Sequence, residues 1–465
     1  MRKLVPALLL LCAWAFASNP RTLAIRNAKI VSVSGPVLSK GTVVVRNGLI
    51  EAVGVNAPIP AGAWIIDGEG MTVYPGLIDA FSTIGIPSLA APPTTAARGG
   101  RNQATPAQPA APTPAPAPAT PVAPAKGPED RPATTSWVLA ADEIDPSDRR
   151  IESVRSAGFT TTITFPARGI FGGQGSIVDL ASEERAGEMV VVPAVGQYVA
   201  VSRGGGMFGG FGAGFPNSLM GYIAYIRQTY LDAEHYRLVK EAYAHDPRGM
   251  ERPQYDRALE GVLASKRILL PANRVVEMDR MLRFAAELGQ PAILYGMREA
   301  YRPEAAPLVK KYGSPVLVSL HWSEAPHDPD PEAYRTMRSL EDVDQGPAAP
   351  GLLQKAGVPF ALYSDGLDQP RDLQRAVKKA IDAGLSRQDA VRALTLSPAE
   401  IYGVADRLGS IDVGKIANLV VTKGDLFDDH TQIEMIFVDG KQYKPAPEPP
   451  AGEGRATTEQ PGANQ

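Results

Sequence analysis

The sequence predicts an α/β protein: a parallel (β/α)8 barrel flanked by a small β-sandwich that both ends of the chain build. Short β-rich runs, separated by Gly and Pro, occupy residues 21–74 and recur over residues 406–443. Between them, over residues 75–405, strand-like runs alternate with helical patterns. Such alternation is typical of a parallel sheet whose crossover connections are helices.

The first residues, MRKLVPALLLLCAWAFA, have the features of a secretory signal peptide. Two basic residues precede an apolar run that is too short to span a bilayer, and small residues follow at Ala15 and Ala17. We therefore expect residues 1–17 to be removed and the protein to be secreted or periplasmic, without a membrane anchor. Cys12 is the only cysteine, so the mature chain can form neither disulfides nor cysteine metal sites.

The charge balance narrows the classes of partner. The chain has 47 basic and 50 acidic residues, so its charge does not predict a basic surface that would bind nucleic acid or an anionic membrane. The expected partner is a small-molecule or peptide-like substrate, or another protein.

The central segment begins with an apolar strand at residue 75 and continues through runs such as FTTTITF, EMVVVPAV, RILLPAN, PAILYG, PVLVSLHW and PFALYSDG. Helical patterns such as RVVEMDRMLRFAAELG follow several of them. Residues 87–135 are rich in Ala and Pro and cannot bury a core, so we expect a disordered, partly polyproline insertion there. The tail, residues 444–465, is expected to be disordered as well.

Several motifs occur in a recognisable order: GTVVVRNGLIEAVG, VYPGLIDA, LTLSPAEIYGV, LGSIDVGKIANLVV and IFVDGKQY. In these motifs the chain resembles the metal-dependent amidohydrolases, and within them the imidazolonepropionase-like branch. The resemblance implies a TIM-like barrel beside a β-sandwich made from both chain ends. It also implies a hydrolase acting on C–N bonds, with one or two divalent metals at the carboxyl ends of the barrel strands.

The resemblance implies a His-x-His pair at the end of strand one, and here PGLID ends at Asp79. The two ligand positions therefore fall on Phe81 and Thr83. Phenylalanine cannot ligate a metal, and a neutral threonine hydroxyl is a poor ligand. The expected metal centre is degenerate, with no cofactor, or as the alternative with a single divalent metal such as zinc.

Asp365, in the run PFALYSDG, matches the aspartate that the family carries at the end of strand eight. The resemblance gives it the catalytic role of proton shuttle, whereas Ser-Asp-Gly after an apolar strand is also ordinary turn chemistry. Asn273 and Arg274 after strand five, and Arg298 after strand six, are candidate substrate-binding residues because they follow barrel strands.

Histidines are few, and two of them fall in the run SLHWSEAPHDPD at the end of strand seven. His321 and His327, together with Glu324 and Asp365, could form an improvised metal site; alternatively they are polar residues of a loop. Two functions thus remain open: a hydrolase with an altered or single-metal centre, and a non-catalytic barrel that binds a ligand or a homologous protein.

Overall fold

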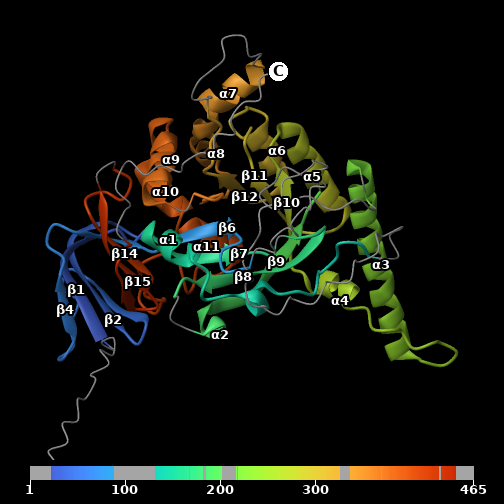
Figure 1. Ribbon diagram of the computed structural model, residues 1–465, viewed down its shortest axis with the longest axis horizontal. Coiled ribbons are helices and arrows are strands. Elements are labelled where there is room, and N and C mark those ends of the chain that lie inside the picture. Colours follow the sequence, from blue (N-terminus) through green and yellow to red (C-terminus); the bar gives the residue numbers. More distant parts are fainter. Residues whose placement is uncertain are drawn as a thin grey trace, which may run out of the picture.

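The computed structural model describes residues 22–87, 131–166, 168–181, 185–201, 216, 218–324, 336–367, 369–428 and 431–446. Within these ranges the strands form two hydrogen-bonded sheets of eight strands each. The smaller unit lies at the left of Figure 1 and the larger, helix-covered unit at its centre and right.

The smaller unit is a mixed sheet to which both ends of the chain contribute, as the sequence predicts. Its order is β16-β15-β14-β5-β1-β2-β3, and β4 pairs with β1 in parallel. The described strands form one sheet, so their arrangement as a two-sheet sandwich stays a prediction. Their bounds are Thr22–Ile30 (β1), Leu38–Arg46 (β2), Leu49–Gly54 (β3), Trp64–Asp67 (β4), Thr72–Pro75 (β5), Leu419–Lys423 (β14), Gln432–Val438 (β15) and Lys441–Tyr443 (β16).

The larger sheet follows the chain in the order β13-β12-β11-β10-β9-β8-β7-β6. Strands β10 to β13 are short apolar runs that are largely buried, as expected for a part of a sheet covered on both faces. Their bounds are Leu77–Ser82 (β6), Phe159–Thr164 (β7), Phe171–Asp179 (β8), Val190–Val199 (β9), Ile268–Ala272 (β10), Ala292–Gly296 (β11), Val316–Ser319 (β12) and Phe360–Tyr363 (β13).

The prediction of an all-parallel sheet is wrong at one strand. β8 runs antiparallel to both β7 and β9, so the sheet is mixed. The reason is the connection: only residues 165–170 separate β7 from β8, and a parallel crossover needs a dozen residues or more. The glycines of β8 weaken its strand pattern in the sequence, but the packing around the strand requires a residue without a side chain. A Cβ on Gly175 would lie 2.2 Å from the ring of Phe165.

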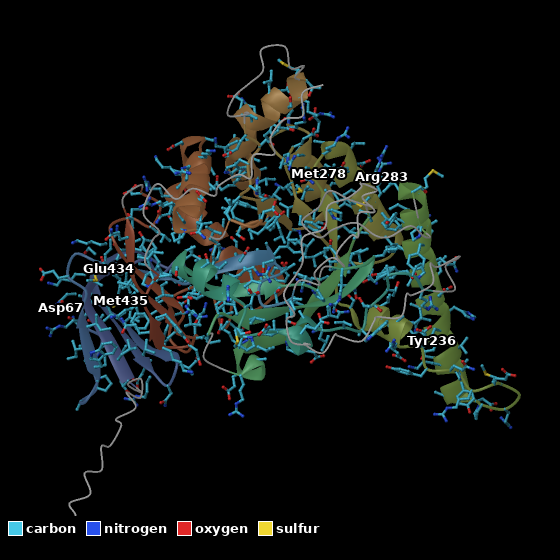
Figure 2. All side chains as sticks on the ribbon, viewed as in Figure 1. Asp67, Tyr236, Met278, Arg283, Glu434 and Met435 are labelled. Carbon is cyan, nitrogen blue, oxygen red and sulfur yellow. The ribbon has the colours of Figure 1, made fainter. Side chains whose placement is uncertain are left out.

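Helices cover the outer side of the larger sheet, as Figure 1 shows for α5, α6, α8 and α9. In α5, Met278 is buried whereas Arg283 is exposed, which fixes the face that the helix presents to the sheet (Figure 2). The bounds are Arg150–Ser156 (α1), Ala186–Met189 (α2), Leu219–His245 (α3), Arg257–Ala264 (α4), Val275–Glu287 (α5), Ala305–Tyr312 (α6), Met337–Gln345 (α7), Ala349–Ala356 (α8), Pro370–Asp382 (α9), Arg387–Ala393 (α10) and Leu396–Tyr402 (α11).

The two edge strands of the larger sheet, β6 and β13, lie against each other. In the described part of the chain no backbone ladder joins them. Instead the buried carboxylate of Asp79 accepts hydrogen bonds from the backbone N–H of Ser364 at 3.0 Å and from its hydroxyl at 2.6 Å. Helix α11 packs over the same two strands, and Tyr402 donates to the carbonyl of Ala80 at 2.9 Å. The sheet therefore curls until its edges meet and are held by side chains.

The boundaries of the predicted disordered segments need correction. The insertion was expected to extend to residue 135, but residues 131–135 belong to the fold. Thr134 is buried and its hydroxyl lies 2.5 Å from that of Tyr225, while the hydroxyl of Thr135 donates to the carbonyl of Phe171. At the tail, the N–H of Ala446 donates to Ser156. Residues 88–130 and 447–465, and the predicted signal peptide, lie outside the described residues.

No helix in the described ranges combines the length and the apolar character that crossing a bilayer requires.

Replacing Asp79 by Asn should change the pH dependence of stability. Burial raises the pKa of Asp79 to about 6, although the hydrogen bonds from Ser364 oppose the shift. Because the folded-state pKa exceeds the unfolded value of about 4, the wild type loses stability as the pH rises from about 4 to 6, by about 2 to 3 kcal/mol. Asn carries no charge; its one amide oxygen can accept from the Ser364 N–H, and its NH2 group can donate to the Ser364 hydroxyl. The stability of Asp79→Asn relative to wild type should therefore rise by about 2 to 3 kcal/mol between pH 4 and pH 7.5.

Urea unfolding at a series of pH values would measure this gap. Asp382→Asn, which removes an exposed carboxylate at the end of α9, is the matched control and should show no such widening. A gap between wild type and Asp79→Asn that stays constant with pH would contradict the assignment.

Candidate functional site

The carboxyl end of β6 carries Phe81, where the resemblance places the first metal ligand. Its side chain is only 1% exposed. The ring stacks on that of Tyr295 from β11 at 4.5 Å between centroids, and meets that of Tyr363 from β13 edge-on at 5.5 Å. Phe165 and Tyr198 complete the cluster at 5.3 and 6.1 Å. Aromatic packing from several strands thus occupies the position of the expected ligand.

The tyrosines of this aromatic cluster are neutral at physiological pH. Burial raises the pKa of the Tyr295 phenol well above its usual range, and burial followed by the nearby Asp365 carboxylate does the same to Tyr363. The Tyr295 hydroxyl lies 3.4 Å from that of Tyr198. The cluster therefore offers a metal ion no anionic ligand.

Thr83, at the second ligand position, is engaged by a neighbouring arginine. Arg150 donates to the Thr83 hydroxyl at 3.2 Å and to its carbonyl at 2.9 Å, and it forms an ion pair with Asp148 at 2.7 Å. A guanidinium beside the hydroxyl repels a cation, so Thr83 has a structural partner in place of a metal.

The ends of β12 and β13 bring His321 and Asp365 next to each other, as expected for neighbouring strands. Their contact is indirect. The Ser319 hydroxyl donates to the Asp365 carboxylate at 2.6 Å and accepts from the backbone N–H of His321 at 3.0 Å. The His321 ring reaches only the backbone carbonyl of Asp365, at 3.4 Å from Nδ1. The exposed imidazole and the carboxylate are adjacent, but the carboxylate is bound to the serine.

The backbone at Asp365 supports turn chemistry. Asp365 has φ of +51° and Gly366 has φ of +89°, so the chain reverses through two left-handed residues directly after β13. Asp tolerates this conformation better than most residues, which explains its presence without catalysis. Its predicted catalytic role is untested and stays a prediction.

Asn273, Arg274 and Arg298 are exposed at the carboxyl ends of β10 and β11. The two segments are joined, because the N–H of Glu299 donates to the carbonyl of Asn273 at 2.7 Å and the Glu299 carboxylate accepts from the N–H of Val275 at 3.0 Å. The three candidates thus share one rim. Their binding of a substrate stays a prediction.

The improvised metal site is incomplete in the described residues. Glu324 pairs with Lys379 of α9 at 3.1 Å, and His327 lies outside the described residues. A catalytic zinc site needs three protein ligands that converge on one point. Within the described ranges no group of three or more His, Cys, Asp or Glu side chains has such an arrangement. The described residues at these strand ends therefore present no three-ligand site.

Sequence reasoning missed the residues that organise this region. The sequence marks Asp79 only as the end of the PGLID motif and places Tyr295 and Tyr363 in strand-like runs, whereas Tyr198 lies outside the runs that it indicates. A single carboxylate inside a fully apolar strand is a signal that could have identified Asp79, since such a group needs a buried partner. The convergence of the tyrosines has no local signal, because they come from three strands.

Comparison with known proteins agrees with the fold and supports a relation to the amidohydrolases. Residues 334–445 match the model of the amidohydrolase family. A stretch of 106 residues is 32% identical to an adenine deaminase of Moorella thermoacetica (strain ATCC 39073 / JCM 9320), covering 23% of this chain. The chain thus spans only 16% of the length of that curated relative.

Solved structures resemble the chain over a much greater length. An amidohydrolase from Thermotoga maritima MSB8 is 25% identical and superposes with a TM-score of 0.68, over 91% of this chain and all of that one. A prolidase in complex with N-methylphosphonate-L-proline has a TM-score of 0.50 at 16% identity, over 91% of this chain and 100% of its own, which shows the fold alone. The architecture of this chain is therefore that of solved amidohydrolases.

Phe81→Ala should destabilise the protein substantially, because it empties the centre of the aromatic cluster. Removing a buried Phe side chain costs about 3 to 5 kcal/mol, whereas Phe81→Leu, which retains most of the apolar volume, should cost less than half as much. Urea midpoints of the two variants would measure the difference. Equal and small effects of both substitutions would contradict a structural role for Phe81.

Proposed function

We propose that this protein is an exported relative of the amidohydrolases, by descent a hydrolase of C–N bonds, whose metal centre is degenerate. Its barrel is proposed to bind a small-molecule or peptide-like ligand, or a homologous protein, without metal-dependent hydrolysis. The family match over residues 334–445 and the likeness to the Thermotoga maritima amidohydrolase support the descent. The N-terminal segment MRKLVPALLLLCAWAFA supports the export.

One observation carries the proposal: the buried ring of Phe81 stacks on Tyr295 where the resemblance places a metal-binding histidine. An amidohydrolase needs a metal ion to generate its attacking hydroxide at neutral pH. A phenylalanine at this point supplies no ligand, and the surrounding neutral phenols supply no charge. Without the activated water the reaction lacks its nucleophile, and Asp365 alone cannot provide one.

A second candidate function is a hydrolase with a single zinc ion. The observation that favours it is the adjacency of His321 and Asp365 at the ends of β12 and β13. In this alternative the two side chains and a third donor, for which the sequence offers His327, would have to leave their present partners and converge.

Metal analysis of the purified mature protein separates the two candidates. The degenerate centre predicts well under one equivalent of zinc, manganese or iron after gel filtration without chelator. It also predicts no hydrolysis of adenine or of dipeptides that end in proline, the substrate types that the related proteins suggest. A stoichiometric metal together with turnover would reject the proposal in favour of the single-zinc hydrolase.

His321→Ala provides an independent measurement. If His321 is a structural residue of the strand end, its removal should leave zinc affinity and any hydrolytic rate unchanged. Glu304→Ala, at the exposed end of another segment that follows a barrel strand, is a control for non-specific effects of a surface truncation. A tenfold or greater loss of zinc affinity in His321→Ala alone would favour the single-zinc hydrolase.

A further inference from the structure

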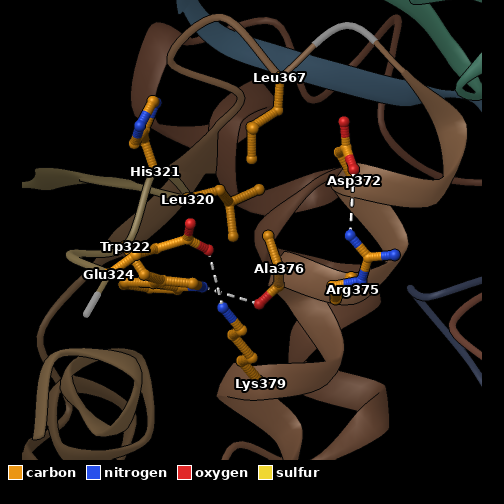
Figure 3. A pocket seen from close by; sticks show the side chains of 9 residues that line it. All are labelled: Leu320, His321, Trp322, Glu324, Leu367, Asp372, Arg375, Ala376 and Lys379. Carbon is orange, nitrogen blue, oxygen red and sulfur yellow. Dashed lines mark hydrogen bonds and ion pairs between the residues drawn. The ribbon is translucent and has the colours of Figure 1, made fainter. Parts of the chain in front are cut away.

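A cavity of about 240 Å³ opens between the segment that follows β12 and the N-terminal half of α9 (Figure 3). The segment after β12 forms one wall, α9 forms the opposite wall, and Leu367 from the turn after β13 lies above them. The cavity is smaller than the usual site of a drug-sized molecule and corresponds to the volume of about eight water molecules. It suits a ligand of the size of a single metabolite.

The lining of the cavity is mixed, and its apolar part consists of Leu320, Trp322, Leu367 and Ala376. Leu320 and Ala376 are buried, and Trp322 is 9% exposed. The indole N–H of Trp322 donates to the carbonyl of Ala376 at 2.8 Å, which fixes the ring against α9. Because that donor is already used, the exposed part of the ring offers an apolar face. This surface would receive a hydrocarbon or aromatic side chain.

The opening of the cavity carries two ion pairs. Glu324 pairs with Lys379 at 3.1 Å, and Asp372 pairs with Arg375 at 3.3 Å (Figure 3). The four charges sum to zero. All four side chains are at least two-fifths exposed, so the pairs contribute little to stability and can open for a ligand at little cost.

His321 stands at the edge of the cavity, and its imidazole is directed away from Ala376 (Figure 3). Its Nδ1 faces the carbonyl of Asp365. The imidazole thus points out of the opening, and the two cations and two anions there determine which ligands are complementary.

We propose that this cavity binds a free α-amino acid with an apolar side chain. The ammonium group would pair with Asp372 or Glu324, the carboxylate with Arg375 or Lys379, and the side chain would pack on Trp322, Leu320 and Leu367. A ligand with only one charge would pair with the side chains of opposite sign. It would also be repelled by the two side chains of its own sign.

This assignment does not depend on the proposed loss of hydrolysis, because binding here requires no metal. Isothermal titration calorimetry on the full mature chain would test it with L-leucine, L-methionine and L-phenylalanine. N-acetyl-L-leucine, which lacks the cation, and L-leucinamide, which lacks the anion, are the matched ligands. Each derivative should bind at least about tenfold more weakly than L-leucine, because it loses one charge-assisted contact. Treatment with a chelator should leave the affinities unchanged.

Two variants test the location. Lys379→Ala should weaken L-leucine binding about tenfold, whereas Lys378→Ala, the adjacent lysine that pairs with Asp382, should not. Leu367→Trp should abolish binding by filling the cavity, with an unchanged circular dichroism spectrum as the control for folding.

Three outcomes would each overturn the assignment. The first is an absence of heat with all three amino acids at millimolar concentration. The second is equal binding of L-leucine and both blocked derivatives. The third is binding that survives both Lys379→Ala and Leu367→Trp.

Discussion

The contact between Asp79 and Ser364 is the constraint on which the barrel region depends. It joins the first and last strands of the larger sheet, which share no backbone ladder in the described part of the chain. The residues on either side of each partner then acquire their positions. Phe81, two residues after Asp79, lies in the aromatic cluster and meets the ring of Tyr363, which directly precedes Ser364. Asp365, which directly follows Ser364, accepts a hydrogen bond from Ser319. This one buried hydrogen-bonded pair thus fixes the positions of Phe81 and of Asp365.

The aromatic cluster packs rings from several strands around Phe81. A metal centre at this point would bring charge into the middle of the sheet and would require anionic or imidazole ligands to hold it. The cluster needs none, because its phenols remain protonated and its rings satisfy one another by stacking and edge-on contacts. Burial of Asp79 beside it is the one electrostatic cost, and two hydrogen bonds from Ser364 offset that cost in part.

Much of this arrangement follows from the sequence, and the failures have physical reasons. The run PGLIDAFS predicts a buried strand that ends near Phe81, and the runs PVLVSLHW and PFALYSDG predict the adjacency of His321 and Asp365, because strand order in such sheets follows the chain. β8 could not be recognised by composition, since its glycines lower its strand character. Gly175 permits the close approach of Phe165, and Gly173 that of Pro166 and of the Val138 carbonyl. The joining of Asp79 to Ser364 links residues 285 positions apart, and no local pattern encodes that distance.

The reversal of β8 has a consequence for the face at which the other strands of the sheet end. Because β8 runs against its neighbours, its carboxyl end opens toward the opposite side, and a short hairpin over residues 165–170 takes the place of one long strand-to-helix loop. The rim is therefore lopsided. Long connections leave the carboxyl ends of β6, β9, β10, β11 and β12 at this face, whereas β7 contributes only the short hairpin, so a molecule that docks here would meet the long connections on one side and the hairpin on the other.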